Sequence, residues 1–305
     1  MPLYRTGWTD LLSGPLRTHR SRPPHQRKRP HRLAYLRRSP RRGLLIRRLS
    51  ECAPVPALSP NPRRRHHIYR LVLWNIDLTL VDVTRVTRAA YPEAFRTVTG
   101  RRLTQLPQLA GRSESEIFFE ALALNGVDVS DLGTSEQLLA PFSSELATAM
   151  AARRADLTTQ GYEMPGAHEA LAAVAQLDGV VQTVLTGTSK ANALLKLRTF
   201  GLEQYFDFGV GGFGSESYPK GALVRVARQR AAEKYGTETA DGDSVYIADS
   251  ARDVDAARMG GAACAAVASG RSTAAELRQA GADAVLPDLT DPAQVVAAVE
   301  RLTRH

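Results

Sequence analysis

Polar side chains occur at four places along the chain, each at or just beyond the end of an apolar stretch. They are Asn75, Asp77 and Thr79, then Thr186, then Lys220, and finally Asp249 and Asp253. Carboxylates suit a hard cation such as Mg²⁺, which binds a few acidic side chains together with water and phosphate oxygens. A lysine and a hydroxyl group suit a second task, which is to neutralise and orient a phosphoryl group. If these side chains meet in space, their types predict a metal-assisted phosphate site.

The elements that must position these residues alternate between apolar strands and helices. The expected strands cover residues 69–76, 179–188, 243–250, 262–269 and 282–288, and the expected helices lie within 165–179, 189–207, 272–281 and 292–302. This alternation predicts an α/β fold with a doubly wound, Rossmann-like parallel sheet. Because the carboxyl ends of parallel strands meet at one edge of such a sheet, residues far apart in sequence can converge there.

Residues 84–161 interrupt this alternation. They contain helical patterns over 87–100, 113–126 and 135–155 and no convincing strand. An insertion directly after the first strand is expected to lie above the carboxyl edge of the sheet, where open α/β folds bind ligands. We therefore predict an all-helical cap at 84–161 on a core formed by 68–83 and 162–305. Arg112 is expected to reach a substrate group when the cap closes, although a solvent-facing loop arginine is an equal alternative.

The basic charge of the protein lies at its beginning. Residues 1–67 hold 17 Lys and Arg against two acids, whereas the rest of the chain holds 23 Lys and Arg against 29 acids. Such an Arg/Pro-rich segment cannot bury enough apolar surface to fold alone, and we predict a disordered basic extension. It is interpreted either as a dispensable extension or as a segment that attracts nucleic acid through counterion release.

Composition limits the remaining classes. A chain of 305 residues with 43% hydrophobic content supports a packed core. Its two cysteines, Cys52 and Cys264, form no disulfide or metal pattern, which favours a cytoplasmic setting. No stretch approaches the roughly 20 apolar residues of a membrane span, so no membrane partner is expected. Nothing in the sequence predicts the oligomeric state.

The ordered polar clusters resemble the motifs of the haloacid dehalogenase-like (HAD) hydrolase superfamily, in particular its phosphoglycolate phosphatase and β-phosphoglucomutase type with a helical cap. The resemblance spans about residues 70–299 and rests on the segments "LVLWNIDLTLVD", "AGRSESEIF", "KLRTFGLEQYFD" and "DSARDVDAARMGG". Each segment is moderately specific, and their correct order makes the joint signal strong.

The resemblance implies a role for each residue. The leading aspartate of the family, which attacks phosphorus, corresponds to Asn75, and the acid/base residue corresponds to Asp77. The implied phosphate-binding residues are Thr186, Lys220 and Arg112, the implied Mg²⁺ ligands are Asn75, Asp77 and Asp249, and the implied supporting residues are Thr79 and Asp253. Taken singly, several have structural explanations, such as a strand-end turn for Thr186 or helix capping for the two later aspartates. Their joint order favours the site.

Asn75 departs from the family pattern, because a carboxamide lacks the charge of a carboxylate and is a poor nucleophile. Three interpretations remain open. The protein binds phosphate without turnover; or Asp77 activates a metal-bound water that attacks phosphorus directly; or Asn75 is a local change, including slow deamidation, relative to an active form. Because the other site residues are present, we predict a Mg²⁺-dependent phosphatase acting on a small phosphorylated metabolite, and the resemblance implies a sugar or sugar-like phosphate. A catalytically impaired phosphate-binding regulator or scaffold is the alternative.

Overall fold

The computed structural model describes residues 70–128, 134–216, 219–236 and 243–303. All of these described residues belong to one compact unit. The predicted disordered extension, residues 1–67, lies outside the described residues, so that prediction stays untested. Within the described part of the chain, no helix is both long and apolar enough to cross a membrane.

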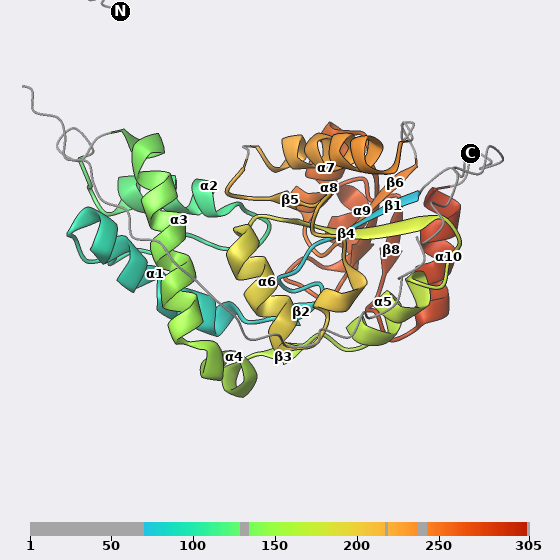
Figure 1. The fold of residues 1–305 in the computed structure, drawn as a ribbon, viewed down its shortest axis with the longest axis horizontal. Helices are drawn as coiled ribbons and strands as arrows, with labels where there is room; N and C mark the ends of the chain where they lie inside the picture. Colours follow the sequence, from blue (N-terminus) through green and yellow to red (C-terminus); the bar gives the residue numbers. More distant parts are fainter. Residues whose placement is uncertain (1–69, 129–133, 217–218, 237–242, 304–305) are drawn as a thin grey trace, which may run out of the picture. The chain divides into compact units, whose positions relative to one another are not determined.

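A six-stranded parallel sheet forms the centre of the fold (Figure 1). Its strand order is β5-β4-β1-β6-β7-β8, and the strands are β1 (Arg70–Trp74), β4 (Val180–Thr186), β5 (Gly212–Phe213), β6 (Ser244–Ala248), β7 (Ala263–Val267) and β8 (Ala284–Leu286). The chain runs outward from β1 in both directions, which is the doubly wound arrangement that the sequence predicts. The central strand, β1, is paired on both sides, and its residues 71–74 are buried.

Helices cover both faces of the sheet, as the alternation of side chains along β1 requires. Val72 and Trp74 join one hydrophobic cluster, whereas Leu71 and Leu73 join another on the opposite face. The first face is covered by α5 (Ala167–Val174), α6 (Lys190–Thr199) and α10 (Pro292–Leu302), and the second by α7 (Lys220–Tyr235), α8 (Ala251–Gly260) and α9 (Ala274–Gln279). A short 3₁₀-helix, Glu203–Tyr205, follows α6.

Four helices lie between two short strands that follow β1. The strands β2 (Val81–Asp82) and β3 (Tyr162–Glu163) pair in an antiparallel manner and enclose α1 (Thr84–Thr99), α2 (Glu114–Leu124), α3 (Ser135–Ala152) and α4 (Arg154–Gln160). We call residues 84–160 the helical insertion. Its centre is aromatic: the rings of Phe118 and Phe142 stack with centroids 4.2 Å apart, and Tyr91 packs against Phe142.

Several elements differ from the sequence expectations, among them the helices α7 and α8, which were not among the expected core helices. The expected helix over 135–155 is divided at Arg153 into α3 and α4. Strand β5 and the pair β2–β3 were not expected, because two residues are too few to establish an alternating pattern.

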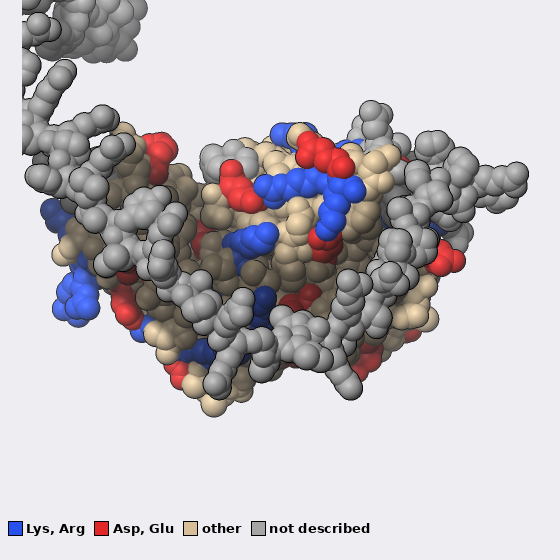
Figure 2. Space-filling view, viewed as in Figure 1, with Lys and Arg blue, Asp and Glu red and all other residues tan. Residues whose placement is uncertain are grey.

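In Figure 2, acidic and basic side chains are interspersed over the visible described surface rather than gathered into a broad basic area. This agrees with the excess of acids over Lys and Arg after residue 67.

Candidate active site

Three neighbouring strands bring the first polar residues together. Asn75 follows the last residue of β1, Thr186 ends β4, and Asp249 follows the last residue of β6. The register places Trp74 beside Val184 on one side and Ile247 on the other, and the Asn75 backbone N–H donates to the Ile247 carbonyl at 2.9 Å. The parallel sheet therefore produces the convergence that the sequence predicts.

A tight turn follows Asn75. The Ile76 carbonyl accepts from the backbone N–H of Leu80 at 2.9 Å, and the Leu78 N–H donates to the Val81 carbonyl at 2.8 Å. Leu78 has a φ of 64°, which is a left-handed conformation that costs a non-glycine residue roughly 1 kcal/mol. The turn directs Thr79 back toward the strand end.

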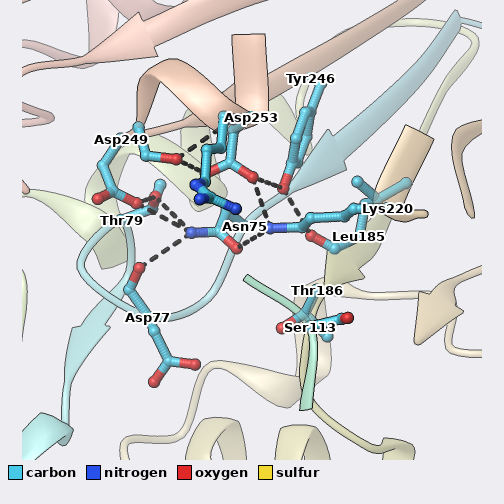
Figure 3. A network of polar contacts seen from close by, with 12 residues as sticks. Asn75, Asp77, Thr79, Ser113, Leu185, Thr186, Lys220, Tyr246, Asp249 and Asp253 are labelled. Atoms are coloured by element: carbon cyan, nitrogen blue, oxygen red, sulfur yellow. Dashed lines mark hydrogen bonds and ion pairs between the residues drawn. The ribbon is translucent and has the colours of Figure 1, made fainter. Parts of the chain in front are cut away.

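The Asn75 amide is at the centre of the polar network (Figure 3). Its Nδ2 donates to the Asp77 carbonyl at 2.9 Å, to Asp249 Oδ1 at 2.9 Å and, more weakly, to Thr79 Oγ1 at 3.3 Å. Its Oδ1 accepts from Lys220 Nζ at 3.3 Å. Both ends of the amide are therefore used, and the side chain is held in one orientation.

Asp249 is buried and receives two hydrogen bonds on one carboxylate oxygen. Thr79 Oγ1 donates to its Oδ1 at 2.9 Å, beside the Asn75 bond. The other oxygen faces Gly270, where a Cβ atom would collide with it. Burial, reinforced by the nearby Asp253 carboxylate, raises the pKa of Asp249 to about 7, against the opposing effect of the Thr79 hydrogen bond. The carboxyl is thus close to the point of neutralisation near neutral pH.

Lys220 and Asp253 form a buried ion pair. Lys220 is the first residue of α7, and its Nζ lies 2.5 Å from Asp253 Oδ1. Asp253 has no exposed surface, and its carboxylate also accepts from Tyr246 Oη at 3.1 Å and Ser250 Oγ at 2.6 Å. Asp253 thus holds the Lys220 ammonium beside Asn75. Its effect on Asp249 is electrostatic, through the repulsion of the two carboxylates.

Asp77 turns its carboxylate away from Asn75 and Asp249 (Figure 3). Lys196 Nζ, from α6, donates to both of its carboxylate oxygens at 2.8 and 2.7 Å. The lysine is only 2% exposed, because it lies on the face of α6 that also buries Ala193 and Leu197 against the core. Sequence analysis missed Lys196. The available signal was a lysine three residues after Ala193, on the face of α6 expected to be apolar.

These groups line a pocket of about 640 Å³, part of which is open to solvent. Five of the predicted site residues lie on its wall: Asn75, Asp77, Arg112, Thr186 and Lys220. Thr79, Asp249 and Asp253 are not on the wall, but they form hydrogen bonds with residues that are. Thr79 and Asp249 bond to Asn75, and Asp253 bonds to Lys220. Other polar lining residues were not predicted: Thr84, Thr87, Glu114, Thr188, Lys196 and Arg271. Among the described residues, no ion pair is recorded for Arg271, which follows β7 in a loop that carried no recognisable pattern.

Arg112 lies on the pocket wall, but its guanidinium group is already engaged within the insertion. It pairs with the Glu120 carboxylate and donates to the Glu116 carbonyl at 3.4 Å. Its Nε is buried and has no partner among the described residues. Arg112 therefore lies on the pocket wall with its Nε unpartnered, and its role as a phosphate ligand stays a prediction.

The segment that joins α1 to α2 contacts the core directly. The Glu114 backbone N–H donates to the Gly187 carbonyl at 2.7 Å, and Gly111, at a φ of 68°, packs against the Ser250 side chain. These contacts hold the insertion over the strand ends. Gly187, which lies between Thr186 and Thr188 on the pocket wall, is therefore a point of contact between the insertion and the core.

Substituting Gly187 by alanine should open this contact, because the added Cβ would collide with the Arg112 carbonyl oxygen rather than with a movable side chain. We expect faster proteolysis of the insertion and at least about tenfold weaker binding of inorganic phosphate. Limited proteolysis and calorimetric titration would measure the two effects. The control is Gly209→Ala, at an exposed glycine where the nearest atoms are the ends of surface side chains. Equal behaviour of both variants would contradict this account.

Glu114 brings a buried carboxyl group to the pocket. Its Oε1 accepts from Thr188 Oγ1 and from Asn192 Nδ2, the latter at 3.1 Å, whereas its Oε2 is buried without a partner among the described residues. Burial raises the pKa of the Glu114 carboxyl, although hydrogen bonds from Thr188 and Asn192 oppose the shift. Glu114 is also one of the residues that line the pocket. In sequence, Glu114 was only part of a helix start.

The side chains do not fit a divalent cation in this arrangement. Among the described residues, no group of three or more His, Cys, Asp or Glu is placed to hold a metal ion. Of the three implied ligands, Asn75 presents an N–H donor to Asp249, and Asp77 gives its carboxylate to Lys196. A cation needs oxygen lone pairs at the point where the amide places hydrogen atoms.

The geometry defines a class before any comparison: a doubly wound α/β protein with a helical insertion and a cation-rich pocket at its carboxyl edge. Comparison with family models matches residues 72–258 to the haloacid dehalogenase-like hydrolases. The match covers more than half of the chain. The protein therefore belongs to the haloacid dehalogenase-like hydrolase family, as the sequence resemblance implied.

Solved structures agree with the fold. A hydrolase from Pseudomonas syringae is 20% identical with a TM-score of 0.55, covering 75% of this chain and 98% of that one. A predicted phosphatase from Clostridium acetobutylicum is 19% identical with a TM-score of 0.55, covering 77% and 100%. A predicted phosphoglycolate phosphatase from Haemophilus somnus is 18% identical with a TM-score of 0.52, covering 76% and 99%. Comparison with curated protein sequences gave no match.

Proposed function

We propose that this hydrolase binds a small phosphate monoester in the strand-end pocket and hydrolyses it slowly, without a phosphorylated side chain at position 75. The observation that carries the proposal is the charge of the pocket wall. Four cationic side chains line it, and they are Arg112, Lys196, Lys220 and Arg271. Two acids, Asp77 and Glu114, share the wall, and one of these is already paired with a lysine. A phosphate dianion would meet an excess of positive charge there.

The substrate class follows from the rest of the wall. Tyr91, Leu109 and Ile117 supply apolar surface, and the unpartnered Glu114 oxygen supplies one hydrogen-bonding group. This combination suits a small ligand with both carbon and hydroxyl surface, in keeping with a sugar-like phosphate. The structural similarity to the predicted phosphoglycolate phosphatase from Haemophilus somnus supports the fold alone.

The chemistry assigned to this wall is direct attack by water. Asp77 takes a proton from the water as its oxygen bonds to phosphorus, and the ester P–O bond breaks. Lys196 donates a proton to the departing oxygen, so that the products are an alcohol and inorganic phosphate. Because Lys196 Nζ lies 2.7 Å from Asp77, the proton can return directly from the carboxyl to the amine. Such acid/base assistance contributes about 10² to 10⁴ in rate.

Binding without turnover is the second candidate, and one observation favours it. The Asn75 side chain is held at both ends and offers phosphorus no nucleophile. In this case the protein would be a phosphate-binding regulator or scaffold. Magnesium dependence stays a prediction from the sequence resemblance, and the orientation of the Asn75 amide argues against it.

Asp77→Asn separates the two candidates. A panel of phosphorylated metabolites is first screened for phosphate release by the unaltered protein, with and without Mg²⁺. If the chain is a hydrolase, Asp77→Asn should lower release by about 100-fold or more, because it removes the base, while leaving phosphate binding within a few-fold. Asp255→Asn, an exposed acid of α8 paired with Arg258, is the control and should change neither quantity.

Calorimetric titration of the same metabolites supplies the complementary measurement. Binding without phosphate release in any protein form would support the regulator. Failure to bind phosphate or any phosphorylated metabolite would end both candidates.

A further inference from the structure

We propose that the Asn75 amide takes the place of a bridging cation, so that this site assembles and binds phosphate without a divalent metal. The inference deepens the proposed function, on which it rests for the identity of the site. It starts from three oxygen acceptors around one nitrogen. Asn75 Nδ2 lies 2.9 Å from the Asp77 carbonyl oxygen, 2.9 Å from Asp249 Oδ1 and 3.3 Å from Thr79 Oγ1.

The orientation of the amide is determined by its neighbours. In the reverse orientation the carboxamide oxygen would face the Asp77 carbonyl and the Asp249 carboxylate, which are both acceptors. Its NH₂ group would then face the Lys220 ammonium, 3.3 Å away on the present geometry, and two donors would meet. The observed orientation matches every donor with an acceptor. The amide hydrogens therefore occupy the space between two oxygens that a cation would otherwise join.

Lysines of the protein already compensate all but one of the acids around the amide. The described inner site holds three acids, Asp77, Asp249 and Asp253, and two lysines, Lys196 and Lys220. Lys196 pairs with Asp77 and Lys220 pairs with Asp253. Asp249 is the remaining acid, and it receives hydrogen bonds from Asn75 and Thr79 on the same oxygen. Two hydrogen bonds thus satisfy the lone pairs of Asp249 Oδ1, and the charge of Asp249 is the one that no lysine of this group compensates.

A carboxylate at position 75 would reverse this situation. An oxygen in the place of Nδ2 would lie close to Asp249 Oδ1 and to the Asp77 carbonyl, with no hydrogen between them. Repulsion between acceptors at such a separation is relieved by a cation, and oxygen ligands are the ones Mg²⁺ prefers. The difference between Asn and Asp at this one position therefore sets whether the site needs a divalent metal.

Thermal unfolding of the unaltered protein and of Asn75→Asp, each in EDTA and in millimolar Mg²⁺, tests the inference. We expect Mg²⁺ to leave the Tm of the unaltered protein within about 1 °C of its value in EDTA. Asn75→Asp should unfold at a lower temperature in EDTA, and Mg²⁺ should raise its Tm by at least about 4 °C, because only the folded state assembles the site. The double variant Asn75→Asp with Asp249→Asn should lose most of that rise.

Calorimetric titration with Mg²⁺ keeps the test valid if Asn75→Asp does not fold. Saturable Mg²⁺ binding by the unaltered protein below about 1 mM would overturn the inference, as would a Tm rise equal to that of the variant. Titration with inorganic phosphate distinguishes the two proposals. Phosphate affinity equal in EDTA and in Mg²⁺ supports the inference, and an affinity at least about tenfold higher in Mg²⁺ contradicts it. Absence of phosphate binding in both media would contradict the proposed function while the Mg²⁺ titration still decides the metal question.

Discussion

Asn75→Asp should raise the rate of phosphate release by at least about a thousandfold in the presence of Mg²⁺, on whichever phosphate monoester the screen identifies. The substitution supplies the carboxylate that the amide lacks. The new oxygen can bond to phosphorus as the ester P–O bond breaks, which divides one difficult displacement into two easier steps. Its neighbours are already in place, since Lys220 lies beside the Asn75 side chain and Thr186 lies on the same pocket wall.

Two further variants make this result specific to the new carboxylate. Asn75→Ala removes the amide without adding a nucleophile and should give no gain in rate. Asn75→Asp combined with Asp77→Asn should lose most of the gain, because the second step needs a base for water. Single-turnover measurements that trap a phosphorylated protein would identify the intermediate. A gain of less than about tenfold, in protein that remains folded, would mean that other parts of the site are also out of position.

Lys220→Met should lower the free energy of unfolding by about 3 to 5 kcal/mol. Asp253 has no exposed surface, and Lys220 Nζ is the cation that compensates it at 2.5 Å. Removing only the lysine leaves a buried carboxylate with Tyr246 and Ser250 as its remaining side-chain donors. These hydroxyl groups satisfy lone pairs but do not cancel the charge. Urea unfolding at neutral pH, followed by far-UV circular dichroism, would measure the loss.

Matched substitutions separate the buried charge from the loss of a lysine. Lys234→Met removes a half-exposed lysine of the same helix, which pairs with Asp207, and should cost less than about 1 kcal/mol. Lys220→Met with Asp253→Asn removes both charges, and should recover part of the loss, because the uncompensated carboxylate is gone. If Lys220→Met costs no more than Lys234→Met, the ion pair does not stabilise the strand-end network.

Local sequence patterns predicted the main strands of the sheet and the edge at which the polar residues gather. Strand residues such as Val72 and Leu73 are apolar in consecutive positions because both faces of a central parallel strand are covered. Polar residues that directly follow such strands must lie at their carboxyl ends, so the sequence predicts that Asn75 and Asp249 lie close together. These inferences use local patterns and one topological rule. The fold class follows from them, whereas the family was implied by the resemblance of four ordered sequence segments.

The contacts of each polar atom could be known only from the three-dimensional packing. The lysine that pairs with Asp77 lies 119 residues away on α6, and its place on an apolar helix face does not indicate which acid it meets. Glu114 and Arg271 reach the pocket from an insertion and from a loop, where no strand-end rule applies. The direction of the Asn75 amide was equally hidden, because it depends on which neighbours donate and which accept. Composition fixes the groups that are present, but hydrogen bonds depend on atomic positions, and those are set by packing across the whole sheet.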